Sequence, residues 1–305
     1  MSEEIHQRCL VVGATGFQGG AVARLLAGRG HRVRSLTRRP AVARPDIAGV
    51  SFVAGDLGSR DDVMWAFKGA THAVVTMPLE YDPLRIETYA IHIAEAALES
   101  GVTRIVYNAN TRVPADTAGV AAFETRRIAE AVLADCGVPL VVLRPPVYLD
   151  NLFSPWNGPA LVDEGVLAYP LPADRRVAWI SHDDLAVAVA AALFNDGLDG
   201  RVLDIGGGQA VDGNELAAAF AEGLGRPVAY QALPPAAFEA ALAKAIGPNA
   251  AAGVAGIYHY MAEGPDERLM DGDPREAEQA LGIKLTSIAG WVAAQPWQTW
   301  SSRPL

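Results

Sequence analysis

The chain is poor in lysine and lacks any long apolar run. Only three of its 25 basic residues are lysines (Lys68, Lys244 and Lys284), and the net charge is −10. Because this balance leaves no broad basic surface, we expect no direct nucleic-acid partner. No apolar stretch reaches the ~18 residues that a membrane span needs, so no membrane partner is expected either.

Cysteine is also scarce, and no metal-binding pattern is present. Cys9 and Cys136 stand alone, and the six histidines form no i, i+4 pair and have no cysteine partner. This arrangement predicts two reduced packing thiols and no metal site. Residues 1–8 carry charges without a following apolar segment, so we expect no signal peptide and a cytoplasmic location.

With 305 residues, half of them apolar, the chain suits one large α/β domain or a domain with a lid. The first half alternates short apolar runs with helical patterns, and we expect a parallel, doubly wound sheet that binds ligands at the carboxyl ends of its strands. The predicted strands are residues 10–12, 32–36, 50–54, 72–77, 104–108 and 140–143, and the predicted helices after the first one are 61–67, 86–99 and 123–136.

This regularity ends near residue 145. Residues 151–174, with four prolines and two glycines, predict an irregular excursion. A short apolar segment, a helix and a strand (177–180, 183–194 and 201–205) then return to the sheet, and the glycines at 206–208 close that strand. The remainder predicts a small helical cap, with helices at about 214–223, 235–246 and 274–281 and an alanine-rich helix or helix pair at 236–255.

The most informative stretch is residues 9–24, where an apolar strand runs into a glycine-rich turn and then a helix. Gly13, Gly16 and Gly19 are spaced by three residues. Gly13 permits a sharp turn, Gly16 allows the backbone to approach a pyrophosphate, and Gly19 allows the helix to pack close to the strand. The helix start then offers N–H groups and a positive dipole end to phosphates. We therefore predict a dinucleotide site at Gly13, Thr15, Gly16, Phe17, Gln18 and Gly19.

The end of the second strand indicates which dinucleotide binds. A site for NAD usually has an acidic residue there, but this chain has Thr37, Arg38, Arg39 and Pro40. Two guanidiniums and a hydroxyl suit a 2′-phosphate, so we predict NADP(H), although the arginines could also be solvated loop charges. Further cofactor contacts are predicted at Asp56 and Leu57, beside the adenine, and at Thr76, Met77 and Pro78, beneath the nicotinamide ribose; Asp56 could also cap the next helix.

Together these segments resemble the NmrA-like family, an atypical branch of the short-chain dehydrogenases/reductases. The resemblance is carried by residues 13–24, 37–40 and 55–57 and by the Leu-Arg-Pro-Pro sequence at 143–146, and it extends from residue 9 to about 209. It implies a Rossmann-type NADP(H)-binding domain (1–151, with 177–208 returning to it) and a smaller, mainly helical C-terminal substrate-binding cap (152–176 and 209–305). The family contains NADPH-dependent reductases and also regulators that bind NADP(H) without turnover.

The usual catalytic pair of the superfamily is absent. Ordinary short-chain dehydrogenases carry Tyr-x-x-x-Lys on one helix, and this helix instead reads Ala-Ala-Phe-Glu-Thr-Arg-Arg-Ile-Ala-Glu over 121–130. NmrA-like proteins often keep a lysine in the pattern Phe-x-x-Lys, which resembles Phe123 to Arg126 here. Arg126 can hold a ribose hydroxyl or a carboxamide, but it cannot donate a proton because its pKa stays above ~12.

Other side chains could assist a reaction. Asn108, followed by Asn110 and Thr111, ends strand five and could orient a substrate oxygen or cap a turn. Tyr81, Tyr148 and Tyr258 could each donate a proton, or could pack with a solvated hydroxyl. In contrast, His182 at a helix start reads as solvated beside a Ser181 or Asp183 cap, and His92 reads as packing or surface.

Three functions remain open. The first is an NADPH-dependent oxidoreductase that transfers hydride to a small activated acceptor (a quinone, an imine or iminium, or a conjugated carbonyl) without the Tyr–Lys pair. The second is a catalytically inactive NADP(H)-sensing regulator, and the third is a cofactor-bound enzyme of non-redox chemistry. A small, fairly apolar substrate would lie under a cap holding Trp156, Tyr258 and Tyr260, in a monomer or homodimer.

Overall fold

The computed structural model describes residues 7–39, 47–264 and 266–301, and these fall into two compact units. The first unit consists of the described parts of Met1–Asn110, Glu124–Arg144 and Leu185–Leu203; the second consists of those of Thr111–Phe123, Pro145–Asp184 and Asp204–Leu305. The predicted roles of 1–151 with 177–208 as cofactor domain, and of the remainder as cap, stay predictions.

A seven-stranded sheet lies at the centre of the first unit, in the order β3-β2-β1-β4-β5-β6-β8. Parallel pairing joins each strand from β3 to β6 to its neighbour. The order reverses between β1 and β4, which is the switch point of a doubly wound sheet, so the predicted Rossmann-type α/β fold is confirmed. The strands are β1 (Arg8–Val11), β2 (Arg32–Thr37), β3 (Val50–Ala54), β4 (His72–Thr76), β5 (Arg104–Asn108), β6 (Leu140–Arg144) and β8 (Val202–Asp204).

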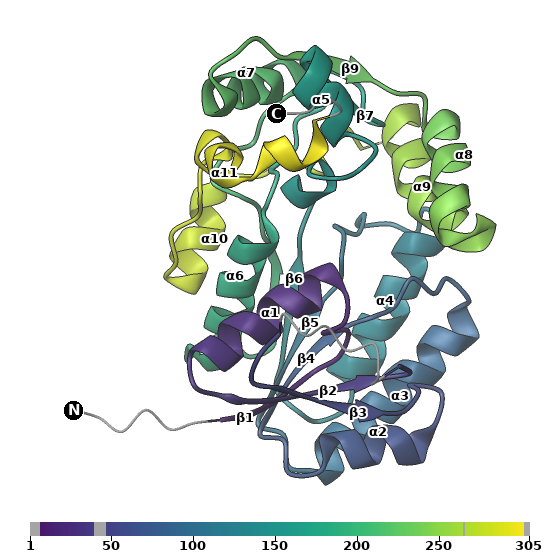
Figure 1. Ribbon diagram of the computed structural model, residues 1–305. Helices are drawn as coiled ribbons and strands as arrows, with labels where there is room; N and C mark the ends of the chain where they lie inside the picture. The colour runs from purple at the N-terminus through teal and green to yellow at the C-terminus, as the bar shows by residue number, and fades with distance from the viewer. Residues whose placement is uncertain (1–6, 40–46, 265, 302–305) are drawn as a thin grey trace. The chain divides into compact units, whose positions relative to one another are not determined.

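Helices cover both faces of this sheet. The helices concerned are α1 (Phe17–Gly28), α2 (Arg60–Phe67), α3 (Pro83–Glu99), α4 (Ala121–Ala134) and α6 (His182–Phe194). Alternate strand residues such as Leu10, Ala73 and Ile105 share one hydrophobic core with α2, α3 and α4. The strand residues between them face the other way because strand side chains alternate, and α1 crosses that opposite face (Figure 1).

Local capping fixes where α2 and α3 begin. Asp82 accepts hydrogen bonds from the backbone N–H groups of Leu84 and Arg85, and Pro83 occupies the first turn. Helix α3 therefore begins three residues earlier than predicted. For α2 the cap is Ser59, which accepts from the N–H of Asp62, so the alternative prediction that Asp56 caps this helix was wrong.

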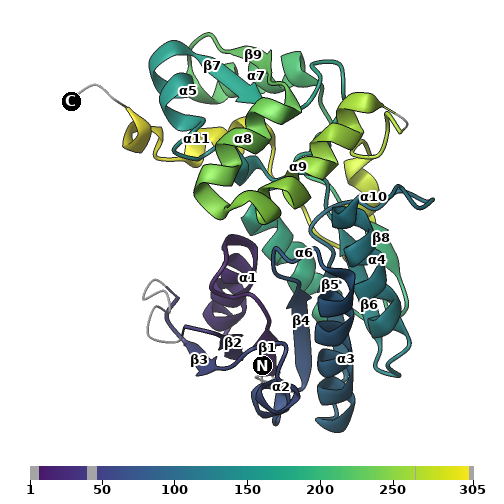
Figure 2. The ribbon, with the colours of Figure 1, turned by 90° about the vertical axis from the view of Figure 1, so that its right-hand side faces the viewer.

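The second unit combines helices with a parallel two-stranded sheet, β7-β9. Its helix pair α8 and α9 packs side by side, as Figures 1 and 2 show. An aromatic-rich core that includes Tyr169, Trp179 and Trp291 holds the unit together. Its elements are α5 (Gly158–Glu164), β7 (Val166–Tyr169), α7 (Gly213–Leu224), β9 (Ala229–Ala232), α8 (Pro235–Ile246), α9 (Pro248–Glu263), α10 (Pro274–Leu281), α11 (Ile288–Ala294), and two short 3₁₀ turns, η2 (Leu149–Asn151) and η3 (Trp297–Trp300).

Several sequence-based expectations for this unit were wrong. The stretch 151–174 contains α5 and β7, because its prolines and glycines lie at the helix start, at the left-handed C-cap Gly165 and after the strand. The segment 177–180 forms only isolated bridges, at Val177 and Ile180. The helix pair that was one alternative for 236–255 is formed by α8 and α9, although α9 runs on to Glu263. Helix α11 and strand β9 were missed, whereas α8 and α10 begin and end as predicted.

Within the described ranges, no helix combines the length and the apolar character that crossing a membrane would require.

Candidate functional site

The glycine-rich turn between β1 and α1 has the geometry expected of a phosphate-binding loop. Gly13 has φ +85°, a left-handed conformation that favours glycine, and its carbonyl accepts the N–H of Gly16 at 2.9 Å. A Cβ at Gly19 would lie 2.4 Å from the Gly13 carbonyl oxygen, so only glycine fits there. The N-cap Gly16 offers no side-chain acceptor to the first N–H groups of α1, and this helix end therefore suits an anion.

The end of β2 presents two exposed guanidiniums. Arg38 and Arg39 are both exposed, and the Thr37 hydroxyl accepts the N–H of Arg39 at 3.2 Å. That bond turns the chain at the end of the strand, and no carboxylate occurs from 37 to 39. Pro40, the next residue of this segment, lies outside the described residues.

The loop after β3 is held by its own polar groups. Asp56 accepts the N–H of Gly58 at 2.7 Å, and its own N–H donates to the Asp62 carboxylate at 2.9 Å. A ring nitrogen of His92, Nδ1, lies 2.8 Å from the Leu57 carbonyl oxygen. His92, predicted as packing or surface, therefore reaches across from α3 and supports the loop that carries Asp56 and Leu57.

At the carboxyl ends of β4 and β5, Thr76 lies opposite Asn108 in the sheet. The Asn108 amide donates to Gln18 Oε1 at 2.8 Å and accepts the N–H of Asn110 at 3.0 Å. Asn108 thus caps the strand-end turn, as one of its two predicted roles required, and also links β5 to the first turn of α1. The Met77 side chain is buried in the core, whereas Thr76 and Pro78 are half-buried.

Asn110 has a strained backbone conformation, and its side-chain oxygen Oδ1 has no hydrogen-bond partner. Its φ of +69° is the only positive φ of a non-glycine residue among the described positions, and asparagine tolerates this region better than most residues. Its side-chain oxygen is buried without a hydrogen-bond partner. Such an atom is costly to leave unpaired in a folded protein, and it lies just past the end of β5.

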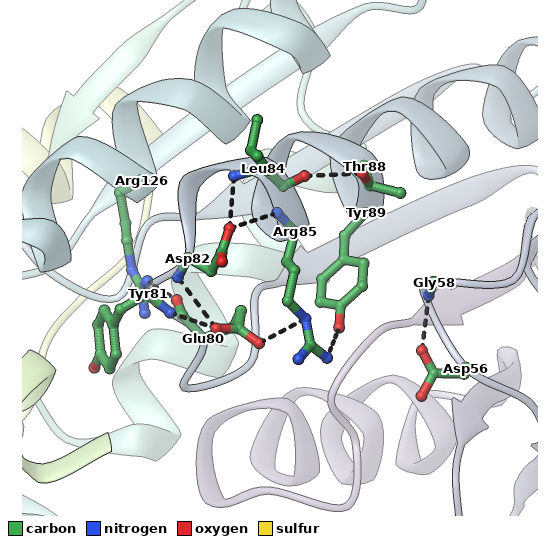
Figure 3. A network of polar contacts seen from close by, with 10 residues as sticks. All are labelled: Asp56, Gly58, Glu80, Tyr81, Asp82, Leu84, Arg85, Thr88, Tyr89 and Arg126. Carbon is green, nitrogen blue, oxygen red and sulfur yellow. Dashed lines mark hydrogen bonds and ion pairs between the residues drawn. The ribbon is translucent and has the colours of Figure 1, made fainter. Parts of the chain in front are cut away.

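Tyr81 and Arg126 meet in the loop between β4 and α3, as Figure 3 shows. The guanidinium carbon of Arg126 lies 5.1 Å from the centroid of the Tyr81 ring, within the range of a cation–π contact. Its Nη1 donates to the Glu80 carbonyl oxygen at 3.3 Å and to the Thr125 hydroxyl at 3.0 Å. Burial raises the pKa of Tyr81, and the Arg126 charge opposes that rise. The phenol therefore stays neutral and can donate a hydrogen bond.

Glu80 sets the shape of this loop. Its carboxylate accepts the backbone N–H groups of Tyr81 at 3.0 Å and of Asp82 at 3.1 Å, and it pairs with Arg85 at 3.0 Å. Arg85 also donates to the Tyr89 hydroxyl at 2.8 Å (Figure 3). These bonds anchor the loop to α3, so Tyr81 is presented by a preformed structure. Glu80 was not among the residues predicted from the sequence, although an acid two residues before a helix N-cap is a recognisable signal.

The second unit contains the other two candidate tyrosines. Tyr258 lies in α9, and its hydroxyl is 2.6 Å from that of Tyr169, which accepts the Asn151 amide at 3.1 Å. The Tyr148 ring lies 4.9 Å from the ring of His182. These hydroxyl and ring contacts are made inside the second unit, and the structure does not bring the two tyrosines to each other.

His182 differs from the expectation that it is solvated. It is 9% exposed, and its Nδ1 lies 3.3 Å from the Asp150 carboxylate. The predicted Ser181 cap is confirmed, because the Ser181 hydroxyl accepts the N–H of Asp184 at 3.0 Å. The burial arises because the Tyr148–Ile180 bridge draws residue 182 against η2, a pairing across 32 residues that local periodicity does not reveal.

Comparison with known proteins identifies the family of this chain. The family model described as the NmrA-like family matches residues 6–291. The chain belongs to this family. A (4-alkanoyl-5-oxo-2,5-dihydrofuran-3-yl)methyl phosphate reductase of Streptomyces griseus is 33% identical over 73% of this chain and 76% of its own. An NAD(P)H azoreductase of Xenophilus azovorans is 29% identical, also over 73% and 76%. The solved structure of an NADPH-dependent quinone oxidoreductase from Escherichia coli is 25% identical and aligns with a TM-score of 0.72 over 94% of this chain and 98% of that one.

As an NmrA-like protein, the chain gathers most of its predicted cofactor residues at one edge of one sheet. The turn residues 13–19, Thr37 with the two arginines, the Asp56 loop, and the ends of β4 and β5 all lie at carboxyl ends of strands in the first unit. Arg126 joins them because α4 runs back from that edge. The arrangement can receive an extended, phosphate-bearing ligand.

Proposed function

We propose that this NmrA-like chain binds NADP(H) along the carboxyl ends of the first unit's strands. The glycine-rich turn carries the proposal, because Gly19 lets α1 pack directly against the Gly13 carbonyl and the N-cap Gly16 leaves the first N–H groups of the helix without a side-chain acceptor. The pyrophosphate would lie against this turn and the start of α1, contacting Thr15, Phe17 and Gln18. Thr37, Arg38 and Arg39 would hold the 2′-phosphate, and Asp56 and Leu57 would border the adenine.

The groups at the ends of β4 and β5 fit the other half of such a cofactor. The orphaned Asn110 oxygen needs a donor, and a ribose hydroxyl or a carboxamide N–H supplies one. Thr76, Met77 and Pro78 offer backbone groups nearby, and Arg126 offers further donors in place of the family's lysine. These residues are proposed contacts of the nicotinamide half.

We propose further that the protein is an NADPH-dependent oxidoreductase. Bound NADPH would supply a hydride to a small acceptor such as a quinone, an imine or iminium, or a conjugated carbonyl. The protein's own part is to hold the acceptor and manage its proton: Arg126 and Asn108 would orient the acceptor, and the neutral Tyr81 hydroxyl would donate a proton or a hydrogen bond. The names of the relatives described above, all reductases, support this class of reaction.

The first test is NADPH fluorescence with the purified protein, followed by a panel of quinones, enones and iminium ions. We expect enhanced fluorescence on binding and an acceptor-dependent loss of signal. Absence of NADPH binding at millimolar cofactor contradicts the whole proposal.

A second function, NADP(H) sensing without turnover, is favoured by one observation. Helix α4 carries no Tyr-x-x-x-Lys pair, and the arginine that replaces the lysine cannot exchange a proton at neutral pH. Tight NADPH binding with no oxidation by any acceptor class would support this function in place of the reductase.

A further inference from the structure

The charges on and around α4 are balanced unevenly. Arg127 pairs with Glu124 at 3.3 Å, and Arg144 pairs with Glu130 at 2.7 Å. Arg126 is only 3% exposed, yet no carboxylate oxygen of the described residues lies within 4.0 Å of its guanidinium. A buried charge without a counter-charge is costly, because the protein replaces its hydration only in part.

The loop that contacts the Arg126 guanidinium carries a carboxylate, Glu80, but does not supply that counter-charge. Glu80 bonds to Arg126 through its backbone carbonyl and not through its carboxylate. The Glu80 carboxylate is held instead by two backbone N–H groups and by Arg85, as Figure 3 shows. Tyr81 adds the face of its ring, which is a weak partner for a cation. The loop therefore positions the guanidinium without neutralising it.

Part of the guanidinium remains available to a ligand. An arginine has five N–H donors. The Nη1 of Arg126 donates to the Glu80 carbonyl oxygen and to the Thr125 hydroxyl, and the guanidinium also interacts with the Tyr81 side chain. Among the described residues, neither a carboxylate nor a backbone carbonyl accepts a hydrogen bond from the Nε or Nη2 of Arg126, which leaves these donors for a ligand. Tyr107, next to the end of β5, donates to the Arg126 carbonyl at 3.4 Å, which keeps this part of α4 at the edge where the nicotinamide is proposed to bind.

We propose that Arg126 selects the acceptor by charge: the site favours quinones and conjugated carbonyls, whose oxygen becomes anionic on reduction, over cationic iminium acceptors. This inference rests on the proposed function. The acceptor takes a hydride, two electrons and one proton, from NADPH, which is oxidised to NADP⁺. The negative charge moves to the acceptor oxygen, which then takes a proton from the Tyr81 hydroxyl or from water.

The selection follows from where charge develops. A preorganised cation stabilises a forming oxyanion strongly, because no reorganisation is needed and the site is partly dry. An iminium ion is already positive, and hydride transfer makes it neutral, so Arg126 repels the substrate and gains nothing in the transition state. Loss of one such donor in other enzymes costs about 10²–10³-fold in rate.

The experiment compares two planar bicyclic acceptors of opposite charge character, 1,4-naphthoquinone and an N-methyl-3,4-dihydroisoquinolinium ion. We measure kcat/KM for both in the wild type, Arg126→Met and Arg126→Lys at one NADPH concentration. The quinone/iminium ratio cancels any change in NADPH binding, which acts on both reactions. We expect the wild type to prefer the quinone, the Met variant to lower the ratio about 100-fold, and the Lys variant to keep most of it.

Arg127→Met is the matched control, since this neighbour on α4 already has a carboxylate partner. Its ratio should stay within about threefold of the wild type. A wild type that reduces both acceptors equally, or an Arg126→Met ratio unchanged from the wild type, overturns the inference while leaving the reductase function standing. No NADPH oxidation with either acceptor or with the wider panel refutes the reductase function itself, and the charge selection with it.

Discussion

The two units place their candidate tyrosines in different kinds of surroundings. In the first unit, Tyr81 stands on a loop braced by Glu80, and its ring faces an arginine whose charge is unpaired among the described residues. In the second unit, Tyr258 is buried between Tyr169 and Phe238, and its hydroxyl is bonded to another phenol. The first arrangement leaves donors for a ligand, whereas the second serves the stability of a core.

The hydrophobic cores of the two units also differ in the kind of side chain that fills them. In the first unit, aliphatic side chains from consecutive strands and helices meet in one layer. In the second, aromatic side chains from segments as distant as Phe153 and Trp300 pack edge to face. We therefore expect substitutions in the first unit's loops to change binding and turnover, and substitutions of buried hydroxyls in the second unit to change stability.

The largest effect is expected at the glycine-rich turn. Gly19→Ala puts a Cβ 2.4 Å from the Gly13 carbonyl oxygen, so the turn must open. NADPH affinity should fall more than ~100-fold, which corresponds to about 2.7 kcal/mol. The matched control is Gly28→Ala in the same helix, where a Cβ meets nothing within 4 Å. Equal NADPH dissociation constants for the two variants would show that the turn does not hold the cofactor.

The next effect concerns cofactor choice. Arg38→Ala combined with Arg39→Ala should weaken NADPH about 100-fold and NADH less than ~3-fold, because charge-assisted hydrogen bonds to the 2′-phosphate are each worth about 1.5–3 kcal/mol. Fluorescence titration with both cofactors measures this. Arg32→Ala, at the opposite end of β2, should change neither. The same loss for NADPH and NADH would contradict the proposed clamp.

A direct comparison of the two tyrosines should separate activity from stability. Tyr81→Phe keeps the ring against Arg126 and removes the proton donor, so quinone turnover should fall at least ~10-fold with unfolding unchanged. Tyr258→Phe removes the hydrogen bond between the two phenols, so that Tyr169 keeps only the Asn151 amide, and it should lower the free energy of unfolding by ~1 kcal/mol with little effect on turnover.

Tyr260→Phe on the same helix is the control for stability, because its hydroxyl makes no hydrogen bond among the described residues. Steady-state kinetics and urea unfolding measure both quantities. A Tyr258→Phe variant that lost turnover but kept its stability would reverse the assignment.

The smallest effect concerns a buried carboxyl of the second unit. Burial raises the pKa of Asp184, although hydrogen bonds from Thr286 and Ser181 oppose the rise. A raised pKa means that the folded state favours the protonated carboxyl. The stabilisation that protonated Asp184 gives the folded protein is therefore fully present below the ordinary aspartate pKa of about 3.9. It is lost as the pH rises through the pKa of Asp184 in the folded state. Relative to Asp184→Asn, the wild type should lose stability on going from pH 4 to pH 7.

Thermal unfolding across that range measures the difference. Asp183→Asn, one residue away and exposed, should show no such trend. A wild-type pH profile parallel to that of Asp184→Asn would mean that the Asp184 carboxyl titrates normally in the folded protein.

The sequence predicted the first unit well because its signals are local. Strand β3 and strand β5 run as predicted, since apolar runs bounded by turns identify buried strands, and the turn at Gly13 is readable from glycine spacing alone. The sequence of the first unit does not predict the burial of Arg126 or its contact with Tyr81. The two residues lie 45 positions apart and are brought together by the loop that Glu80 shapes.

The second unit was predicted less well because its pairings are distant. Strand β7 pairs only with β9, so Tyr169 lies opposite Ala232, and neither strand has a hairpin partner nearby to mark it. The buried His182 was predicted to be solvated because Asp150, whose carboxylate lies 3.3 Å from its Nδ1, belongs to another segment. Periodicity identifies faces of elements, but it does not identify which distant segment covers them.

The hydrogen bond between Asn108 and Gln18 sets an order of assembly during synthesis. It joins residues 90 positions apart in the chain, so the first turn of α1 lacks this support until β5 has left the ribosome and docked beside β4. A nascent chain that stops short of Asn108 can contain every glycine of the turn and still lack its brace. The ability to bind a dinucleotide should therefore appear abruptly as the chain lengthens, at the point where β5 closes the sheet.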